Sequence, residues 1–384
     1  MDFLFAIYAV AILFSFFVVG AVIGAVVSSR IREKLSEVLH VDLTFLERRR
    51  LNRSEANPLL RPGHSPWTAE AVLNPAALVL GNRVHLIYRA VGNDGVSRLG
   101  YTSSVDGIAF DVKLSYPAFI ARSPRHLSRH LRIYSPVMYP SGGSWGGCED
   151  PRMVLIEGRV YVTYNMFDGW NFIRVAVISI DKDDFLAGRF WKWDGPHILS
   201  PAGQIHKNWI LFPEKIGGKF ALLHSLFGET DDRVRIEYID DLESFVPPKG
   251  FVSADPHRMP DNNIAWHYRM RSAGPPPVKT DRGWLLFYHA MDRREPHRYK
   301  MGVMLLDLAD PTKILYRSPG PVLEPDASYE NEGKPGIVYA CGAVIRDGEI
   351  YVYYGGGDRV ICLATAPLTD FLDALVHGET LPLK

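Results

Sequence analysis

The sequence predicts an all-β chain, a five-bladed β-propeller preceded by one N-terminal transmembrane helix. Three observations lead to this prediction: an uncharged run near the amino terminus, a composition rich in turn and aromatic residues, and a hairpin pattern that recurs five times. Aromatic residues make up 12% of the 384 residues, and 33 glycines and 27 prolines supply many turns. Such a composition favours short strands joined by turns.

The uncharged run extends from Phe3 to Ser29 and is long enough to cross a bilayer as a helix. It lacks the basic start and the short apolar core of a cleaved signal peptide, so we expect an anchor. Seven basic residues follow between Arg30 and Arg53, and the positive-inside rule therefore predicts a single-pass membrane protein whose large C-terminal part faces the cytoplasm. The predicted domains are the anchor (1–29), a basic juxtamembrane linker (30–56) and the propeller (57–384).

The repeated pattern is a glycine turn, a strand ending in an aromatic residue or histidine, a polar loop and a second strand. Its five copies begin at Gly81, Gly158, Gly218, Gly283 and Gly348, spaced 60 to 77 residues apart. This spacing leaves room for roughly four strands per copy, and five small sheets that pack on one another radially would bury their faces. A β-sandwich is the alternative, but strands of a sandwich recur about every 8–12 residues, which is far shorter than the spacing of these copies.

In a propeller the inner strands end around one shared cavity. The residues expected there are Arg89, Asn165, Ser225, His289 and Tyr354.

Charge and cysteine content exclude several classes of protein. Lys and Arg total 43, as do Asp and Glu, so the basic surplus of a nucleic-acid binder is missing. The three cysteines lack metal-ligand spacing, which predicts neither a metal site nor a disulfide framework and favours a reducing compartment. Gly20 and Gly24 form a GxxxG spacing, which leaves a homo-oligomer open.

The segment Glu149-Asp150-Pro151-Arg152 places two adjacent acids beside an arginine. Adjacent acids in such a loop are commonly a solvated turn, and a lone lysine such as Lys207 is normally a surface charge. They occur here with further motifs, in order along the chain: Asn74-Pro75-Ala76-Ala77, Tyr88-Arg89-Ala90, Leu211-Phe212-Pro213-Glu214-Lys215, Ala273-Gly274-Pro275-Pro276-Pro277, Tyr288-His289, Leu305-Leu306-Asp307-Leu308, Cys341-Gly342-Ala343 and Tyr353-Tyr354-Gly355-Gly356-Gly357-Asp358.

With these motifs the sequence resembles glycoside hydrolase family 130, the β-mannoside phosphorylases. The resemblance extends from about residue 57 to residue 372, and it also implies a five-bladed propeller. It implies that Asp150 is the general acid. The phosphate ligands it implies are Arg89, Arg152, Lys207 and His289; the expected substrate-binding residues are Asn74, Arg271, Glu332 and Asp358.

The implied reaction is inverting phosphorolysis, or reverse synthesis, of a β-mannosidic bond, giving α-mannose 1-phosphate. An inverting hydrolase needs a second carboxylate to activate water, whereas a phosphorylase replaces it with cations that hold phosphate. The expected partners are a mannoside oligosaccharide and inorganic phosphate as co-substrate, with no cofactor and no nucleic acid. A β-mannoside hydrolase or mannosyltransferase of the same fold, and a non-catalytic carbohydrate-binding propeller, are the alternatives.

Three positions depart from the family pattern. Asn208 follows Lys207 where the family has aspartate, Arg271 stands in place of a lysine, and a family asparagine is missing around Gly336-Ile337. These departures leave the acceptor sugar and the linkage open.

Overall fold

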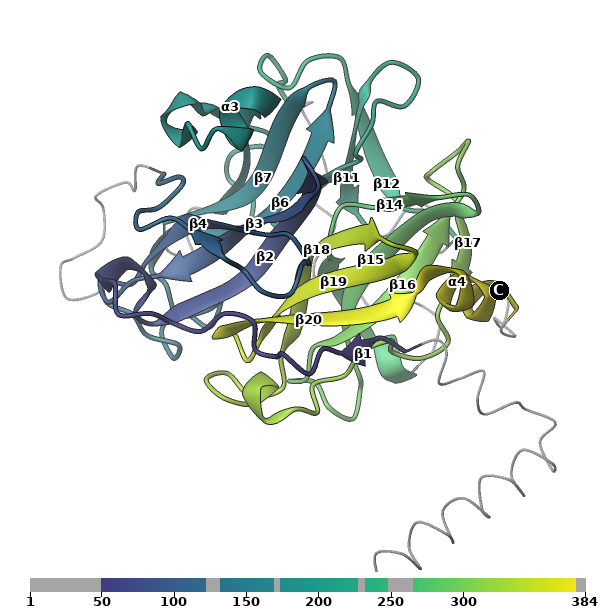
Figure 1. The fold of residues 1–384 in the computed structure, drawn as a ribbon. Helices are drawn as coiled ribbons and strands as arrows, with labels where there is room; N and C mark the ends of the chain where they lie inside the picture. The colour runs from purple at the N-terminus through teal and green to yellow at the C-terminus, as the bar shows by residue number, and fades with distance from the viewer. Residues whose placement is uncertain (1–49, 122–131, 169–172, 227–231, 248–264, 378–384) are drawn as a thin grey trace, which may run out of the picture. The chain divides into compact units, whose positions relative to one another are not determined.

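The compact unit of the chain begins at Arg50 (Figure 1). The computed structural model describes residues 50–121, 132–168, 173–226, 232–247 and 265–377. The predicted anchor and most of the predicted linker lie outside these ranges. Residues 50–56, the end of that linker, belong to the compact unit, where β1 (Asn52–Arg53) pairs with the last strand, β20 (Val360–Pro367).

The described strands fall into four sheets. The largest has eight strands: β2 (Ala71–Leu80), β3 (Arg83–Val91), β4 (Val96–Ser104), β5 (Val112–Lys113), β6 (Gly146–Ile156), β7 (Arg159–Asp168), β8 (Ile173–Asp181) and β9 (Asp194–Ile198). A three-stranded sheet holds β10 (Ile210–Leu211), β11 (Phe220–Ser225) and β12 (Arg235–Ile239). The five-stranded sheet is β13 (Arg269–Ala273), β14 (Val278–Thr280), β15 (Gly283–Met291), β16 (Lys300–Leu306) and β17 (Ile314–Arg317). The four-stranded sheet joins β1 and β20 to β18 (Val338–Arg346) and β19 (Glu349–Gly356).

The predicted fold class is wrong as stated, because the described strands do not separate into five blades. The first two hairpin copies share the eight-stranded sheet. They are joined by a short parallel pairing of β4 with β6, in which Val96 lies opposite Gly146 and Ser97 opposite Gly147. Two residues of non-local pairing leave no periodic signal, so the sequence pattern could not indicate this merger.

The membrane part of the prediction is corrected as well. The described residues contain two α-helices, α3 (Lys182–Leu186) and α4 (Leu368–His377), and neither could span a membrane. The run Phe3–Ser29, on which the anchor and the single-pass location rest, lies outside the described residues. The described structure therefore gives no support to the predicted anchor or to the single-pass location.

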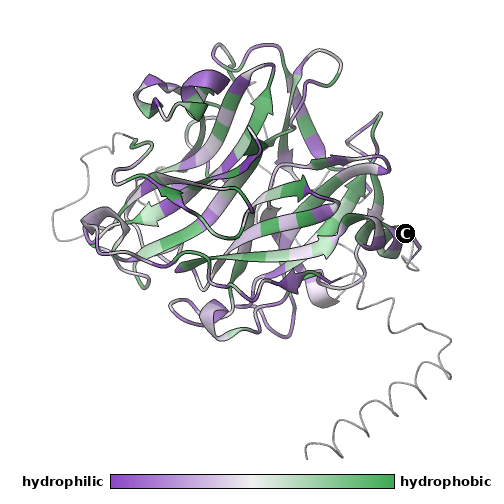
Figure 2. Cartoon of the chain, in the orientation of Figure 1, coloured by the Kyte–Doolittle hydropathy of each residue, from purple (hydrophilic) through white to green (hydrophobic). Residues whose placement is uncertain are grey.

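The five glycine-led hairpins themselves are present. Their strand pairs are β3 with β4, β7 with β8, β11 with β12, β15 with β16, and β19 with β20. Hydrophobic residues are concentrated in these strands, whereas α3 and many connecting loops are hydrophilic (Figure 2). Short 3-10 turns lie in the connections: η1 (Pro66–Thr68), η3 (Phe190–Lys192), η4 (Ala265–His267) and η5 (Ser328–Glu330).

The apolar core is divided into clusters that lie between consecutive hairpins. One cluster joins Ile87 of the first copy to Val162 of the second, and another joins Val177 of the second to Leu222 of the third. The last copy packs on the first, where Tyr353 meets Leu86. Each hairpin therefore buries apolar side chains on both of its neighbours, which holds the ends of the inner strands close together.

A buried ion pair fixes the N-terminal strand of the unit. Glu330 is fully buried, and Arg53 donates to its two oxygens from Nε and Nη2, both at 2.8 Å. The hydroxyl of Tyr354 donates to the same carboxylate at 2.8 Å. Without Arg53 this carboxylate would be a buried charge with no cationic partner.

We expect Arg53→Met to lower the free energy of unfolding by about 3 kcal/mol, because removal of one partner of a buried ion pair leaves the other uncompensated. Arg50→Met is the matched control, since Arg50 is 61% exposed and lies 3.8 Å from Glu324. Urea unfolding measures both. Equal losses in the two variants would show that the Arg53–Glu330 pair is not a special stabilising contact.

Candidate active site

Backbone bulges aim several candidate residues into one cavity. In β2 the register shifts between Leu73 and Ala76, and in β6 it shifts between Glu149 and Arg152. The residues at these bulges, Asn74 and Asp150, have left-handed φ angles of 49° and 51°. A bulge redirects a side chain out of the alternating pattern, and Asn and Asp tolerate this conformation better than most residues.

The side chains of Asn74 and Asp150 meet at the cavity wall. Asn74 Nδ2 donates to Asp150 Oδ1 at 2.7 Å. Gly355 makes room for Asn74, because a Cβ at that position would lie 2.2 Å from Asn74 Oδ1. Asn74 Oδ1 is buried and has no hydrogen-bond donor among the described residues.

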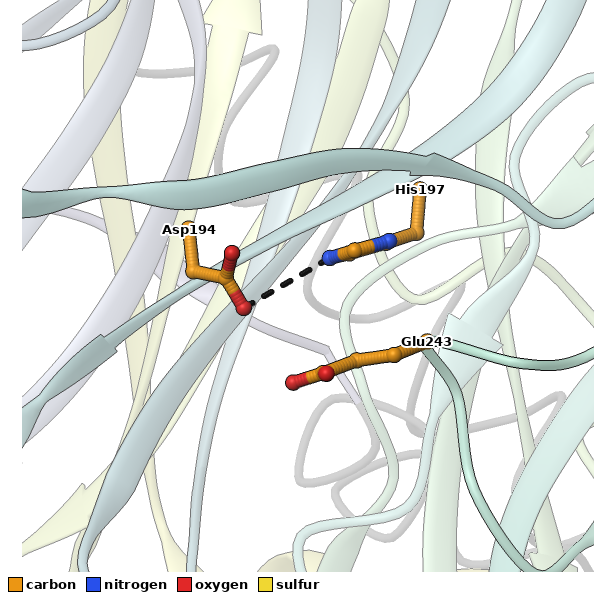
Figure 3. Close-up of side chains that lie close together, drawn as sticks. All are labelled: Asp194, His197 and Glu243. Atoms are coloured by element: carbon orange, nitrogen blue, oxygen red, sulfur yellow. Dashed lines mark ion pairs between the residues drawn. The ribbon is translucent and has the colours of Figure 1, made fainter.

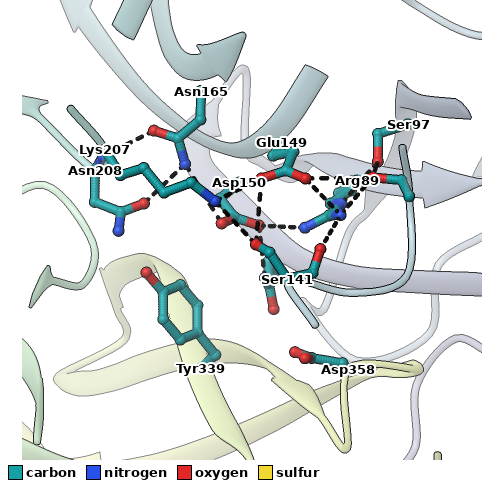
Figure 4. A network of polar contacts seen from close by, with 12 residues as sticks. Arg89, Ser97, Ser141, Glu149, Asp150, Asn165, Lys207, Asn208, Tyr339 and Asp358 are labelled. Atoms are coloured by element: carbon teal, nitrogen blue, oxygen red, sulfur yellow. Dashed lines mark hydrogen bonds and ion pairs between the residues drawn. The ribbon is translucent and has the colours of Figure 1, made fainter. Parts of the chain in front are cut away.

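Arg89 is the centre of a buried polar network (Figure 4). Its Nη2 donates to Glu149 Oε1 at 3.0 Å and its Nη1 to Asp150 Oδ1 at 3.2 Å. Further donations reach Ser97 Oγ, Ser141 O and Ser144 Oγ. The guanidinium therefore compensates two adjacent buried carboxylates on β6. It is held in place by Ser97 on β4 and by the 141–144 loop.

Lys207 completes the network from a separate part of the chain. Its Nζ lies 2.9 Å from Glu149 Oε2 and 2.9 Å from Ser141 Oγ. Next to it, Asn208 and Asn165 exchange two hydrogen bonds, at 2.8 and 2.9 Å. Asn165 Nδ2 also lies 3.4 Å from Asp150 Oδ2, so this amide pair borders the second oxygen of the candidate acid.

The cavity beside this network has a volume of about 590 Å³. Six of the nine sequence-predicted site residues line it: Asn74, Arg89, Asp150, Lys207, Arg271 and Asp358. Of the five residues expected around a shared cavity, Arg89 and Ser225 line it, Asn165 reaches Asp150, and Tyr354 instead binds Glu330.

The other three predicted residues lie elsewhere. Arg152 is buried and donates to the backbone carbonyls of Gly274 at 3.1 Å and Asp150 at 2.6 Å. His289 is also fully buried, and its Nε2 accepts from the backbone N–H of Ala340 at 2.9 Å. Glu332, 47% exposed, lies 3.8 Å from Arg61 and is not among the cavity residues. None of these three contacts the cavity directly.

The pKa values of two carboxyl groups in the cavity are shifted in opposite directions. Burial raises the pKa of Asp150, but the charges of Arg89, Lys207 and Arg152 outweigh burial and hold it below its usual value. Burial also raises the pKa of Asp358, and Lys334, at 3.8 Å, only partly offsets this effect, so the net shift is upward. Opposed shifts in one cavity are typical of sites that handle protons.

Several residues at the cavity were not predicted from the sequence. Lys334, Tyr339 and Ser272 line the cavity, and Glu149 lies fully buried directly behind it. The repeated glycine pattern marks strands and turns only, so it gives no signal for such residues. The pair Glu149-Asp150 did stand out, although its first member is a structural partner of Arg89 and Lys207.

A group of metal-ligand types occurs away from the cavity. Asp194 and His197 on β9 and Glu243 after β12 place one ligand atom each within 4.8 Å of one another (Figure 3). His197 Nε2 lies 3.5 Å from Asp194 Oδ2. None of these three residues lines the cavity that holds Asp150.

A buried acid with cations and amides around it, in an open cavity, can donate a proton to a leaving oxygen and bind an anion, as a carbohydrate-cleaving site must. Residues 45–377 match the family model Glyco_hydro_130, described as β-1,4-mannooligosaccharide phosphorylase. The chain belongs to glycoside hydrolase family 130, and the family predicted from the motifs is confirmed.

Individual relatives agree with this membership. A 1,2-β-oligomannan phosphorylase of Thermoanaerobacter sp. (strain X514) is 34% identical over 84% of this chain and 98% of that protein. A β-1,2-mannobiose phosphorylase of the same organism is 32% identical over 82% and 96%. The solved β-1,2-mannobiose phosphorylase of Listeria innocua, in complex with β-1,2-mannobiose, superimposes with a TM-score of 0.62 at 23% identity, covering 85% of this chain and 99% of that one.

The buried histidines predict an acid-sensitive fold. Burial lowers the pKa of His206 and His224 to about 4 and that of His289 to about 3. An unfolded histidine titrates near 6.5, so as the pH falls the unfolded chain takes up these protons first. Stability is therefore full above about pH 6.5 and declines towards pH 4.

The measurement is the thermal unfolding midpoint at pH 7.5 and at pH 5.0, which we expect to be lower at pH 5.0. His224→Gln removes one of the titrating groups and should make the midpoint less dependent on pH. A midpoint that stays constant from pH 7.5 to 5.0 would mean that the folded chain protonates these histidines as readily as the unfolded one.

Proposed function

We propose that this chain cleaves β-1,2-mannosidic bonds by phosphorolysis, with inversion, to give α-mannose 1-phosphate. Its family is one of glycoside phosphorylases acting on β-mannosides. The β-1,2 linkage is supported by the two relatives above 30% identity, both named for that linkage. The observation that carries the mechanism is the position of Asp150 in a cavity that is also lined by four cations, Arg89, Lys207, Arg271 and Lys334.

In this proposal Asp150 protonates the oxygen that leaves the mannosyl unit. Its Oδ1 is fixed by Asn74 at 2.7 Å and by Arg89 at 3.2 Å. Among the described residues its Oδ2 has one hydrogen bond, the 3.4 Å contact with Asn165, so we take it as the oxygen available to a substrate. Asn74 Oδ1, which lacks a donor among the described residues, is suited to accept from a sugar hydroxyl.

Phosphate then attacks the anomeric carbon from the side opposite the leaving oxygen. It brings its own negative charge, so the site needs cations and hydrogen-bond donors rather than a second catalytic base. Arg89 is the cation that contacts the acid, and Lys207, Arg271 and Lys334 line the same cavity. No cofactor enters this scheme.

Hydrolysis is the second candidate, because Asp358 supplies another cavity carboxylate. An inverting hydrolase would use it as the base that activates water. Its raised pKa weakens that role, since a base must be ionised before it can accept a proton.

The deciding experiment incubates the full-length chain with β-1,2-mannobiose in the presence and absence of inorganic phosphate. With phosphate we expect α-mannose 1-phosphate, identified by ³¹P NMR, and without phosphate no cleavage. β-1,4-Mannobiose is the comparison substrate, and it should react more slowly than β-1,2-mannobiose. Cleavage to free mannose without phosphate would instead favour the hydrolase, and turnover only with a nucleotide sugar would favour a mannosyltransferase.

We expect Asp150→Asn to lower kcat by about 100-fold or more, because general acid catalysis typically contributes that much and an amide has no acidic proton to give. The shape of the side chain is kept, so binding of β-1,2-mannobiose should persist in equilibrium titration. A variant that retains more than about a tenth of the wild-type kcat would remove Asp150 from this role.

A further inference from the structure

Two hydroxyl groups form a pair on the cavity wall. Ser272 on β13 and Tyr339 on β18 both line the cavity, and their oxygens lie 2.9 Å apart. Figure 4 shows Tyr339 across the open space from Asp150 and Lys207. Neither hydroxyl carries a charge, and neither residue is among those that the sequence motifs predict for the site.

Behind the pair, His289 donates to Ser272. The backbone N–H of Ala340 points at Nε2 of His289, so this nitrogen must be an acceptor. The ring is buried and neutral, since burial and Arg152 lower its pKa to about 3. Its proton is therefore on Nδ1, which lies 3.3 Å from Ser272 Oγ. The ring stacks on Tyr339 at 4.0 Å, which fixes both side chains.

Arg152 approaches the pair from the other end. Its Nη2 donates to Tyr339 Oη at 3.4 Å. Each hydroxyl oxygen thus receives one hydrogen bond from a buried donor behind it, His289 at Ser272 and Arg152 at Tyr339.

The two hydroxyl groups have one proton more than the described residues can accept. If Tyr339 donates to Ser272, the serine oxygen accepts twice, and its own proton has no acceptor among the described residues. If Ser272 donates to Tyr339, the tyrosine oxygen accepts twice and its proton is left over. Either arrangement leaves one O–H of the pair without a protein acceptor in the described ranges, and both residues line the cavity.

We propose that the Ser272–Tyr339 hydroxyl pair is an oxyanion-binding site that holds the phosphate co-substrate on the side of the cavity facing Asp150. His289 and Arg152 are positioning residues, which act on phosphate through this pair. The inference rests on the proposed phosphorolysis. It also gives these two residues a connection to phosphate although neither contacts the cavity.

The chemistry of the pair suits an anion. Burial raises the pKa of Tyr339, so its hydroxyl remains a proton donor at neutral pH. A hydrogen bond to a charged acceptor is roughly twice as strong as one to a neutral acceptor. An inverting displacement places the nucleophile opposite the general acid, and Tyr339 lies across the cavity from Asp150 (Figure 4).

The test uses Ser272→Ala, Tyr339→Phe and the double variant in the full-length chain. Each single variant keeps one hydroxyl that can turn to the cavity, so we expect KM for phosphate to rise only about threefold. The double variant has no such donor, and its KM for phosphate should rise about tenfold or more, the usual cost of losing a hydrogen bond to a charged group. KM for β-1,2-mannobiose should change less than about twofold, in keeping with the cost of a neutral contact.

Controls separate this effect from general damage. Tyr351→Phe removes a hydroxyl from β19 outside the cavity and should leave KM for phosphate unchanged. Mannobiose binding without phosphate verifies that the double variant is folded. His289→Phe keeps a ring on Tyr339 but removes the Nδ1 donor, and it should raise KM for phosphate without raising KM for mannobiose.

The outcomes distinguish the two proposals. Wild-type cleavage that needs no phosphate overturns the proposed function. Wild-type cleavage that needs phosphate, together with an unchanged KM for phosphate in the double variant, overturns the hydroxyl-pair site alone. An equal rise in KM for phosphate and for mannobiose also overturns it, since the pair would then shape the cavity as a whole.

Discussion

The site depends on the compensation of two adjacent buried carboxylates by Arg89. Removing a charge from water costs several kcal/mol unless a partner of opposite charge replaces the water. Glu149 is fully buried and Asp150 nearly so, and the one guanidinium contacts both. Because Arg89 is on β3 and the acids are on β6, this compensation forms only when the first two hairpins meet. The parallel pairing that merges their sheets lies beside this contact, since Ser97 of β4 accepts from Arg89 Nε.

The strands deliver side chains to the cavity through bulges. Register shifts occur at Asn74, at Asp150, between Leu223 and Ser225, at Arg271, and between Ala340 and Gly342. All five hairpin copies thus carry an irregularity near the inner end of their sheet. At four of these irregularities a residue without a partner on the neighbouring strand lines the cavity. These residues are Asn74, Asp150, His224 and Arg271. A regular strand alternates its side chains between two faces, so the bulge is what turns an extra residue towards the strand's end.

This geometry explains what the sequence could predict. The hairpins follow from two local signals, which are glycine turns and apolar strands, and all five predicted hairpins are present in the structure. The number of sheets depends on two residues of parallel pairing between β4 and β6, for which no local signal exists. Asn74 and Asp150 precede proline and have side chains that tolerate left-handed backbone, so their bulges left a trace in the sequence. Arg152 and His289 show the limit. Whether a buried cation or imidazole faces a cavity or a backbone group depends on which carbonyl or N–H the neighbouring strand presents, here Gly274 O and Ala340 N.

The electrostatics of the cavity suggest why phosphate would be preferred to water. The charges of Arg89, Lys207 and Arg152 keep Asp150 ionised, and an ionised carboxylate cannot protonate a leaving oxygen. A phosphate anion that binds near these cations offsets their charge, and its own charge raises the pKa of the neighbouring carboxyl. Arrival of the nucleophile would thereby also favour protonation of the acid. Water brings no charge and would leave Asp150 in its unproductive form. In this arrangement the cations serve two purposes: they attract phosphate, and in its absence they hold the proposed acid in the state that does not react.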